Sequence, residues 1–252
     1  MGGRSLDGVV LSPAELGNAI SSLEADVLAL QEVDRAQPRS GYRDFTAEIA
    51  AALNAADARF VPTLVGTPGG RWRSVTDDTV VDPTDPAYGV ALISRLPVHG
   101  WAVTRLRSSR VYAPLAVATA RGWRVVPVKD EPRAMLAATV QTPEGPLTVA
   151  SAHLSFVPGW NVRQLRRCTA QLRTATSAAF LLGDFNLPPA VVRRATGWRS
   201  LVQEPTWPSH RPRVQLDHVL SRASQVHVTS ARTCALAVSD HRALITDLVL
   251  RD

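Results

Sequence analysis

Short apolar runs that end in acidic or histidine-containing motifs constrain this chain more than any other feature. Residues 27–30 lead into Glu32, and residues 179–182 lead into Asp184. Short apolar runs of this kind are typical of buried strands. A carboxylate at the end of a buried strand costs free energy unless it binds a metal or another polar group. The pattern therefore predicts a strand-rich fold in which several polar side chains meet in one pocket.

Three further motifs occupy the same kind of position beside predicted strands. They are Ser151-Ala152-His153, Asp217-His218 and Ser239-Asp240-His241. Each motif alone is more typical of a turn or a helix cap than of a functional site, and Asp184 could in the same way cap a helix that begins near Pro188. Their occurrence together in one chain favours a shared site.

Helical and strand patterns alternate along the chain without a linker or an internal repeat. The capping-box pattern of Ser12 and Glu15, with Pro13 between them, predicts a helix that begins at Ser12. The other predicted helices cover residues 45–53, 161–174 and 188–194, and the predicted strands cover residues 27–30, 59–64, 90–93, 98–106, 135–141, 147–153, 179–182, 217–221, 226–231 and 244–250. Residues 66–86 are polar and predict a long loop. This order predicts one layered α/β domain over residues 1–252, with two packed sheets.

The charge of the chain narrows the range of partners. Its formal net charge is +6, its pI is about 10.3, and Lys129 is the only lysine among 28 basic residues. A basic surface favours polyanions such as nucleic acid, phosphorylated small molecules or anionic lipid. An arginine-rich, lysine-poor composition is equally typical of a GC-rich genome, so both explanations stay open.

Composition also limits the class of protein. Cys168 and Cys234 form no CxxC or other metal-ligand spacing, and we expect both to be buried free thiols. The apolar stretches are too short to cross a membrane, and residues 1–11 lack the features of a leader. We therefore expect a cytoplasmic monomer without a transmembrane segment.

The ordered set of motifs resembles the endonuclease/exonuclease/phosphatase superfamily of deoxyribonuclease-I-like, metal-dependent phosphoesterases. The matching motifs are, in chain order, residues 25–34, 88–95 and 131–134, His153-Leu154, Gly183-Asp184-Phe185-Asn186, Thr206-Trp207-Pro208, Leu216-Asp217-His218 and Ser239-Asp240-His241. Their order and spacing cover nearly the whole chain. The resemblance implies a four-layered α/β sandwich, in which two packed mixed β-sheets are flanked by helices.

The resemblance also implies a divalent metal, Mg²⁺ or Mn²⁺, bound by Glu32 and Asp240. Such hard cations prefer carboxylate and water oxygens as ligands. It further implies that Asp184 activates the attacking water, and that Asn186 holds the phosphate or the nucleophile in line. Arg133 would either contact phosphate or pair with a neighbouring glutamate.

Two histidines would complete the implied site. His241, oriented by Asp217, would stabilise the transition state, and His153 would donate a hydrogen bond from another side. His218 directly follows Asp217 in a predicted strand, so we expect it to point to the opposite face. We therefore leave His218 out of the site.

One part of the resemblance is missing from this sequence. Members of the family usually begin with a strand that ends in a metal- or phosphate-binding Asn, whereas residues 1–8 resemble the loop that follows such a strand. Asn18 and Asn54 lie in predicted helices and are poor replacements. A lost strand would leave backbone groups of its neighbours unpaired. Three explanations stay open: a start recorded too late, a shortened chain, or lost activity.

The leading hypothesis is a metal-dependent phosphodiesterase or phosphomonoesterase. Its substrate stays open between nucleic acid, a phosphorylated small molecule and a lipid headgroup. A DNA nuclease or repair endonuclease is the alternative, supported by the basic charge and by Trp72 between Arg71 and Arg73, which could stack on a base. A tryptophan on such a loop is more often a packing residue, so this explanation also stays open. A catalytically impaired binding module is a third hypothesis, suggested by the missing strand alone.

Overall fold

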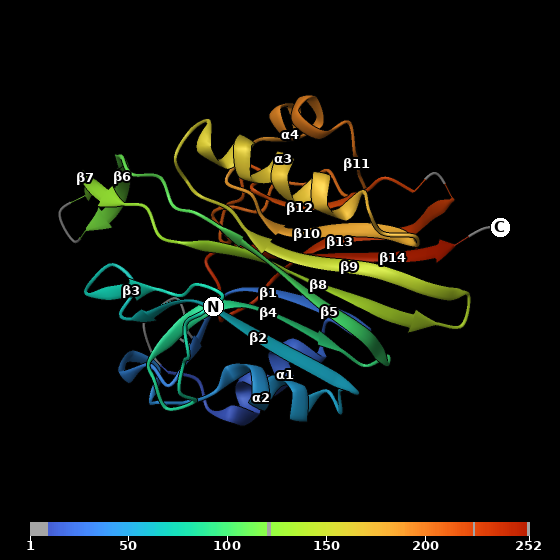
Figure 1. Cartoon of the computed structure of the whole chain (residues 1–252), viewed down its shortest axis with the longest axis horizontal. Coiled ribbons are helices and arrows are strands. Elements are labelled where there is room, and N and C mark those ends of the chain that lie inside the picture. Colours follow the sequence, from blue (N-terminus) through green and yellow to red (C-terminus); the bar gives the residue numbers. More distant parts are fainter. Residues whose placement is uncertain (1–9, 120–121, 224, 251–252) are drawn as a thin grey trace.

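The computed structural model describes residues 10–250, except for residues 120, 121 and 224. Its helices are α1 (Pro13–Ser21), α2 (Phe45–Ala52), α3 (Trp160–Leu172) and α4 (Pro189–Thr196), with a 3₁₀ turn at Pro38–Ser40. Two β-sheets pack face to face between a layer formed by α1 and α2 and a layer formed by α3 and α4 (Figure 1). The predicted four-layered α/β sandwich is confirmed.

The first sheet lies against α1 and α2. Its strands are β1 (Val27–Arg35), β2 (Asp57–Gly66), β3 (Trp72–Ser74) and β4 (Ala87–Ser94), in the order β1-β4-β2-β3. Every neighbouring pair among them is antiparallel, so in the described chain this sheet is antiparallel, not mixed as the resemblance implied. All residues of β4 are buried, which explains its nearly continuous apolar sequence.

The second sheet lies against α3 and α4. Its strands are β5 (Val98–Leu106), β8 (Arg133–Thr142), β9 (Gly145–His153), β10 (Ala178–Asp184), β11 (Arg199–Ser200) and β12 (Asp217–Ser221), in the order β11-β12-β10-β9-β8-β5. Strands β9 and β10 are parallel and the other pairs are antiparallel, so this sheet is mixed. The predicted hairpin through residues 142–146 is present as β8–β9.

Two hairpins complete the described chain. Strands β13 (Val226–Ala235) and β14 (Arg242–Leu250) form one of them, and β6 (Tyr112–Thr119) and β7 (Gly122–Lys129) form the other. The β6–β7 hairpin projects beyond the sandwich (Figure 1). Sequence patterns did not predict β6, β7 or the short strand β3, which lies inside the stretch expected to be a loop.

Local signals in the sequence explain where the first helix begins. Ser12 caps α1: its hydroxyl accepts the backbone N–H of Glu15, and the Glu15 carboxylate accepts the backbone N–H of Ser12 at 2.8 Å. The predicted capping box is therefore confirmed. None of the described helices is long and apolar enough to cross a membrane.

The two cysteines differ from the expectation in one respect. Both thiols are free, and Cys168 is fully buried, whereas Cys234 is only half-buried because it lies on the two-stranded β13–β14 hairpin. Burial raises the pKa of the Cys168 thiol to about 12. Cys168 is therefore a packing residue of α3.

Candidate active site

One cavity of about 720 Å³ brings together most of the predicted site residues. Glu32 comes from β1, Asp184 from the end of β10 and Asp217 from the start of β12. Asp240 and His241 come from the loop between β13 and β14. Segments far apart in the sequence therefore place four carboxylates and an imidazole around the same space.

The backbone around Asp184 leaves this carboxylate little freedom. Gly183 has a φ of 140°, and a Cβ at this position would lie 1.9 Å from the carbonyl oxygen of Ala152, so only glycine fits. Asp184 Oδ1 accepts a hydrogen bond from the backbone N–H of Asn186 at 2.9 Å. Burial raises the pKa of Asp184, and the nearby charge of Asp217 raises it further, to about 7. Asp184 therefore exchanges a proton near neutral pH.

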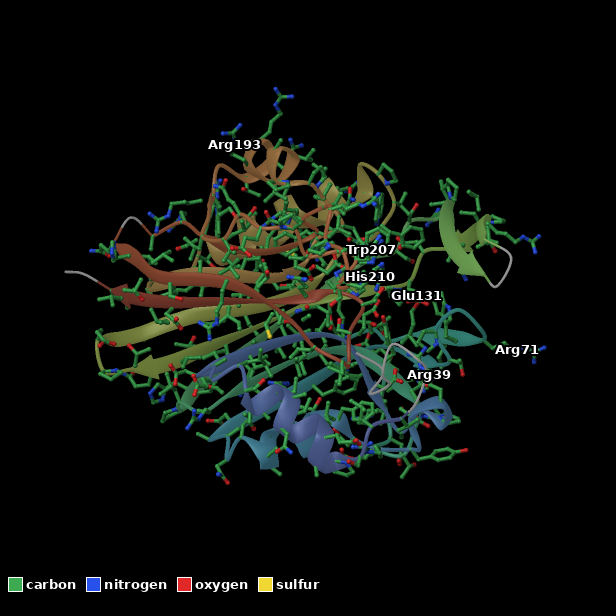
Figure 2. All side chains as sticks on the ribbon, turned by 180° about the vertical axis from the view of Figure 1, so that it is seen from behind. Arg39, Arg71, Glu131, Arg193, Trp207 and His210 are labelled. Atoms are coloured by element: carbon green, nitrogen blue, oxygen red, sulfur yellow. The ribbon has the colours of Figure 1, made fainter. Side chains whose placement is uncertain are left out.

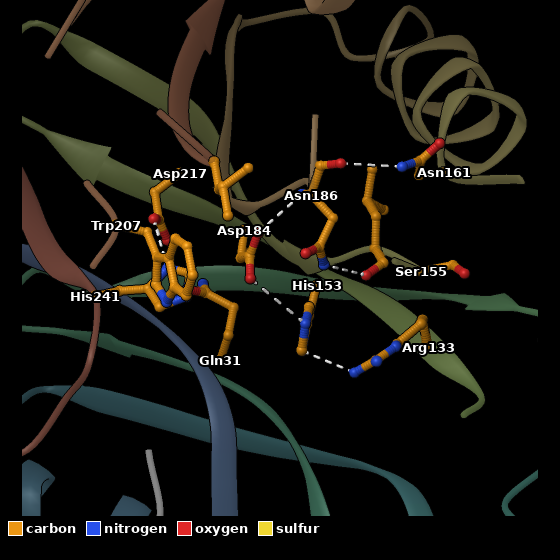
Figure 3. A network of polar contacts seen from close by, with 12 residues as sticks. Gln31, Arg133, His153, Ser155, Asn161, Asp184, Asn186, Trp207, Asp217 and His241 are labelled. Carbon is orange, nitrogen blue, oxygen red and sulfur yellow. Dashed lines mark hydrogen bonds and ion pairs between the residues drawn. The ribbon is translucent and has the colours of Figure 1, made fainter. Parts of the chain in front are cut away.

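Asn186 is held in a left-handed conformation beside Asp184. Its φ is 51°, which is uncommon for any residue other than glycine. Its side-chain N–H donates to the backbone carbonyl oxygen of Leu154 at 3.1 Å (Figure 3). Its backbone carbonyl oxygen accepts a hydrogen bond from the side-chain N–H of Asn161 at 3.0 Å. Such strain persists only where the surroundings fix it, and it clusters at functional sites.

His241 and Asp217 form a tightly bound pair. His241 Nδ1 lies 2.8 Å from Asp217 Oδ2, and the backbone N–H of Asp217 donates to the Thr206 hydroxyl (Figure 3). Burial lowers the pKa of His241, but the hydrogen bond and the charge of Asp217 outweigh it and raise the pKa to about 9. His241 is therefore an imidazolium at neutral pH, with Nε2 on the side of the ring away from Asp217.

His153, unlike His241, is held in the neutral state. The buried Arg133 guanidinium donates to His153 Nδ1 at 2.9 Å, because a guanidinium has no lone pair to offer. Burial and the charge of Arg133 lower the pKa of His153 well below its ordinary value. The neutral ring therefore carries its proton on Nε2, which lies 3.7 Å from Asp184 Oδ2.

Glu32 sits at an irregularity inside β1. The register with β4 shifts between Leu30 and Val33, and Glu32 has a φ of 58°, so the strand continues beyond the predicted end with a bulge at this residue. Desolvation by the surrounding protein raises the pKa of Glu32. The charge of Arg133 and a hydrogen bond from the Tyr88 hydroxyl lower it, and the net pKa lies below the ordinary value. Glu32 is therefore ionised at neutral pH.

Asp240 lies at the exposed rim of the cavity. Its carboxylate accepts a hydrogen bond from the Trp207 indole N–H at 3.4 Å, and its backbone carbonyl accepts from the N–H of Ser209. Figure 3 shows Trp207 beside His241 and Asp217. The rim of the site is thus part carboxylate and part aromatic.

The donor set of the cavity suits a hard divalent cation. Asp184, Asp217 and His241 offer ligand atoms that all lie within 4.8 Å of one another. Glu32 and Asp240, the two expected metal ligands, line the same cavity but do not belong to this compact group of described residues. Since carboxylates dominate the set and thiols do not line the cavity, its chemistry matches Mg²⁺ or Mn²⁺ better than a soft metal.

Sequence reasoning named Arg133 without its partner His153, missed the contact of Tyr88 and excluded His218. Arg133 bonds to His153, while Glu131 accepts the backbone N–H of Gly69 at 3.0 Å. The hairpin register could have found Arg133, because β8 and β9 pair the next residue, Ala134, with His153. The contact between Tyr88 and Glu32 had no signal of this kind, since it depends on the bulge in β1.

His218 lies apart from the chemistry, as expected. It is buried, its ring stacks on Phe185 with centroids 5.2 Å apart, and its Nε2 lies 2.8 Å from the carbonyl oxygen of Leu187. These contacts make His218 a packing residue between β12 and the start of α4.

Comparisons with known proteins agree with this fold. Residues 1–241 match the sequence profile of the Endonuclease/Exonuclease/phosphatase family, and the chain belongs to this family. Its members are hydrolytic phosphoesterases and nucleases, which generally use a divalent metal. A search of curated protein sequences found no match.

Solved structures share the fold at low sequence identity. An endonuclease/exonuclease/phosphatase from Bacteroides vulgatus has a TM-score of 0.63 and 17% identity, over 95% of this chain and 90% of that one. The human Nocturnin catalytic domain with bound sulfate has a TM-score of 0.59 and 18% identity, over 96% and 88% of the two chains. Bacteroides thetaiotaomicron mannosyl-6-phosphatase has a TM-score of 0.56 and 14% identity, over 94% and 90%.

Proposed function

We propose that this chain hydrolyses phosphoester bonds with the help of Mg²⁺ or Mn²⁺. One observation carries the proposal: Asp184, with a pKa raised to about 7, lines the same cavity as the His241 cation and the ionised Glu32. A proton acceptor that works near neutral pH therefore faces a group that stabilises negative charge.

Asp184 is the proposed general base. It takes a proton from the water that attacks phosphorus, and a carboxylate with a pKa near the working pH is suited to this transfer. Its hydrogen bond from the Asn186 backbone fixes its orientation. The Asn186 side chain lies beside it and would hold the phosphate or the nucleophile in line.

His241 and His153 are the proposed donors to the phosphoryl group. The imidazolium of His241, held by Asp217, would stabilise the negative charge that develops in the transition state. His153 would donate from Nε2 as a neutral ring, because Arg133 occupies Nδ1. The two rings therefore contribute in different charge states.

Glu32 and Asp240 are the proposed metal ligands, because both carboxylates line the same cavity as Asp184. A bound divalent metal would neutralise charge on a phosphoryl oxygen. The ring of His241 is less suited to this task, since its proton is held by the bond to Asp217.

The proposal leaves two classes of phosphoester substrate, a sugar phosphate and a nucleic acid. Mannosyl-6-phosphatase acts on a sugar phosphate by its name, and the Nocturnin domain was solved with a tetrahedral anion. A nuclease is supported by the net charge of +6 and by Lys129, which lies over the ring of Trp72 on β3 at 4.6 Å. Either substrate would meet the same acidic and histidine groups.

The test compares turnover of p-nitrophenyl phosphate, bis-p-nitrophenyl phosphate and plasmid DNA, with Mg²⁺, with Mn²⁺ and with EDTA. We expect metal-dependent release of product from at least one of them. Asp184→Asn should abolish most of it, while Asp78→Asn, on an exposed loop residue, should not. Turnover that survives EDTA would contradict the metal, and full activity of Asp184→Asn would remove the proposed base. Binding of DNA without any turnover would favour the impaired binding module.

A further inference from the structure

The positive charge of the chain is concentrated in one short part of it. Residues 160–199 contain seven arginines and a single acidic residue, Asp184, so their formal net charge is +6. This equals the net charge of the whole chain, and the rest of the sequence is therefore neutral. Six of the seven arginines are exposed on α3, its C-cap or α4, and we call them the arginine face: Arg163, Arg166, Arg167, Arg173, Arg193 and Arg194. A bias in composition alone would spread arginine over the chain.

The arginine face has no acidic partner. Neither α3 nor α4 contains an acidic residue, and none of the six arginines forms an ion pair with another described residue. Like charges three and four positions apart on a helix repel, as Arg163 does with Arg166 and Arg167. These three precede the last turn of α3, so they do not compensate the negative end of the helix dipole. Helix stability therefore does not explain them, whereas an anionic partner does.

A groove between α3 and α4 gathers three of these guanidinium groups. It has a volume of about 610 Å³ and is lined by Arg166 of α3 and by Arg193 and Arg194 of α4. The rest of its lining consists of alanine and valine side chains. Figure 2 shows Arg193 on the outer side of α4, across the sandwich from α1 and α2, which contain glutamate but no basic residue. A guanidinium is a planar fork of donors that matches the oxygens of a phosphate.

The side chains around the arginines favour a nucleic-acid duplex over other polyanions. Membrane-docking faces add exposed aromatic or aliphatic residues to the basic ones, and protein interfaces depend on aromatic anchors. None of the exposed large hydrophobic residues of the described chain lies on α3 or α4. Proteins that hold single strands likewise need exposed rings on which bases stack. A duplex is bound through its outward-facing phosphates and needs no such ring.

The length of the arginine face also suits a phosphate backbone. Arg163 and Arg173 are ten residues apart, or about 15 Å at the rise of an α-helix. One strand of a duplex carries a phosphate about every 3.4 Å along the axis, so α3 covers about four phosphates. Arg193 and Arg194 add two donors on the other side of the groove.

We propose that the arginine face binds the phosphate backbone of a nucleic-acid duplex. The face adjoins the candidate active site, because the Asn161 side chain in the first turn of α3 donates to the carbonyl oxygen of Asn186 at 3.0 Å (Figure 3). Helix α4 begins at Pro189, three residues after Asn186. A duplex on this face therefore lies beside the catalytic cavity. Delivery of a phosphodiester to Asp184 rests on the proposed function, whereas binding to the arginines does not.

Fluorescence anisotropy with a short labelled DNA duplex tests the proposal on the whole chain, in EDTA so that binding is measured without turnover. The triple variant Arg166→Gln, Arg193→Gln and Arg194→Gln should weaken binding about tenfold or more. Between about 50 and 200 mM NaCl, the slope of log affinity against log salt should become shallower by about 2 to 3, because each lost phosphate contact contributes about 0.9.

A matched variant separates the position of the charges from their number. Arg59→Gln, Arg95→Gln and Arg232→Gln remove the same charge from exposed residues outside the face, and the salt slope should stay unchanged. Both triple variants should keep the melting temperature and the p-nitrophenyl phosphate turnover of the unaltered chain, since none of the six positions lines the catalytic cavity. Equal loss of binding in the two variants would overturn the assignment to this face, because binding would then follow total charge.

Other probes decide which polyanion the face accepts. Tighter binding of phosphatidylserine vesicles or of polyglutamate, lost in the Arg166, Arg193 and Arg194 variant, would overturn the proposal in favour of a membrane or an acidic protein. No binding of the duplex at about 50 mM salt, or an unchanged salt slope in that variant, would overturn it outright. Arginine-dependent binding by a chain that hydrolyses no phosphoester would support it and contradict the proposed function alone.

Discussion

The guanidinium of Arg133 donates a hydrogen bond to Nδ1 of His153 over 2.9 Å, and both side chains are buried. This one contact decides two properties of the histidine. It places the ring proton on Nε2, which faces Asp184, and it adds a positive charge that opposes protonation of the ring. Arg133 is therefore a positioning residue for the proposed chemistry.

Replacement of Arg133 should release His153 from this state. In Arg133→Met we expect the pKa of His153 to rise, because the opposing charge is gone, and the rate constant kcat to fall about 10- to 100-fold, as for other residues that orient a catalytic ring. Nitrogen-15 NMR of the His153 ring would show a mixture of tautomers. Arg110→Met, on an exposed arginine, is the control. An unchanged tautomer in Arg133→Met would contradict the assigned role.

The pKa values of Asp184 and His241 predict a bell-shaped dependence of rate on pH. Asp184 must lose its proton to act as base, so the rate should rise with pH through about 7. His241 must keep its proton to act as a cation, so the rate should fall as pH rises through about 9. Measurement of kcat/KM from pH 5 to pH 10.5 checks both limbs. A rate that stays flat across this range would rule out both roles.

Asp217 raises the pKa of both Asp184 and His241, so its removal should shift both limbs of the pH–rate profile in the same direction. Asp217 raises the pKa of His241 through their hydrogen bond, and its charge also raises the pKa of Asp184. In Asp217→Asn both limbs should therefore shift to lower pH. Asp78→Asn should leave the profile in place. Limbs that move in opposite directions would contradict this electrostatic account.

Metal affinity gives a separate prediction for Glu32. Glu32→Gln keeps the shape of the side chain but removes its charge, so the metal concentration for half-maximal rate should rise about 10- to 100-fold. The maximal rate at saturating metal should change much less. Titration of the rate with Mn²⁺ measures both quantities. An unchanged midpoint would remove Glu32 from the metal site.

The strands of the site could be predicted from the sequence more reliably than the contacts between its side chains. Apolar runs that precede Glu32 and Asp184 predict buried strands, because runs of four residues are too short for helices. The position of His218 also followed from strand alternation, since it comes one residue after Asp217. These inferences depend on local periodicity, which a sequence displays directly.

Contacts across strands needed the register, which periodicity does not supply. Tyr88 reaches Glu32 only because β1 has a bulge opposite β4. The β6–β7 hairpin was missed because its residues lack a strict alternation and include Pro114 and Pro127, which argue against a strand.

Gly183 is the position where the site tolerates least change. A Cβ there would lie 1.9 Å from the carbonyl oxygen of Ala152, and φ is 140°. Gly183→Ala should therefore push β10 away from β9, lower the free energy of unfolding by about 3 kcal/mol or more, and displace Asp184. Gly100→Ala is the matched control, because no atom lies within 4 Å of its added Cβ. Thermal unfolding and turnover of both variants give the answer: equal melting temperatures would mean that β10 and β9 are not packed as described.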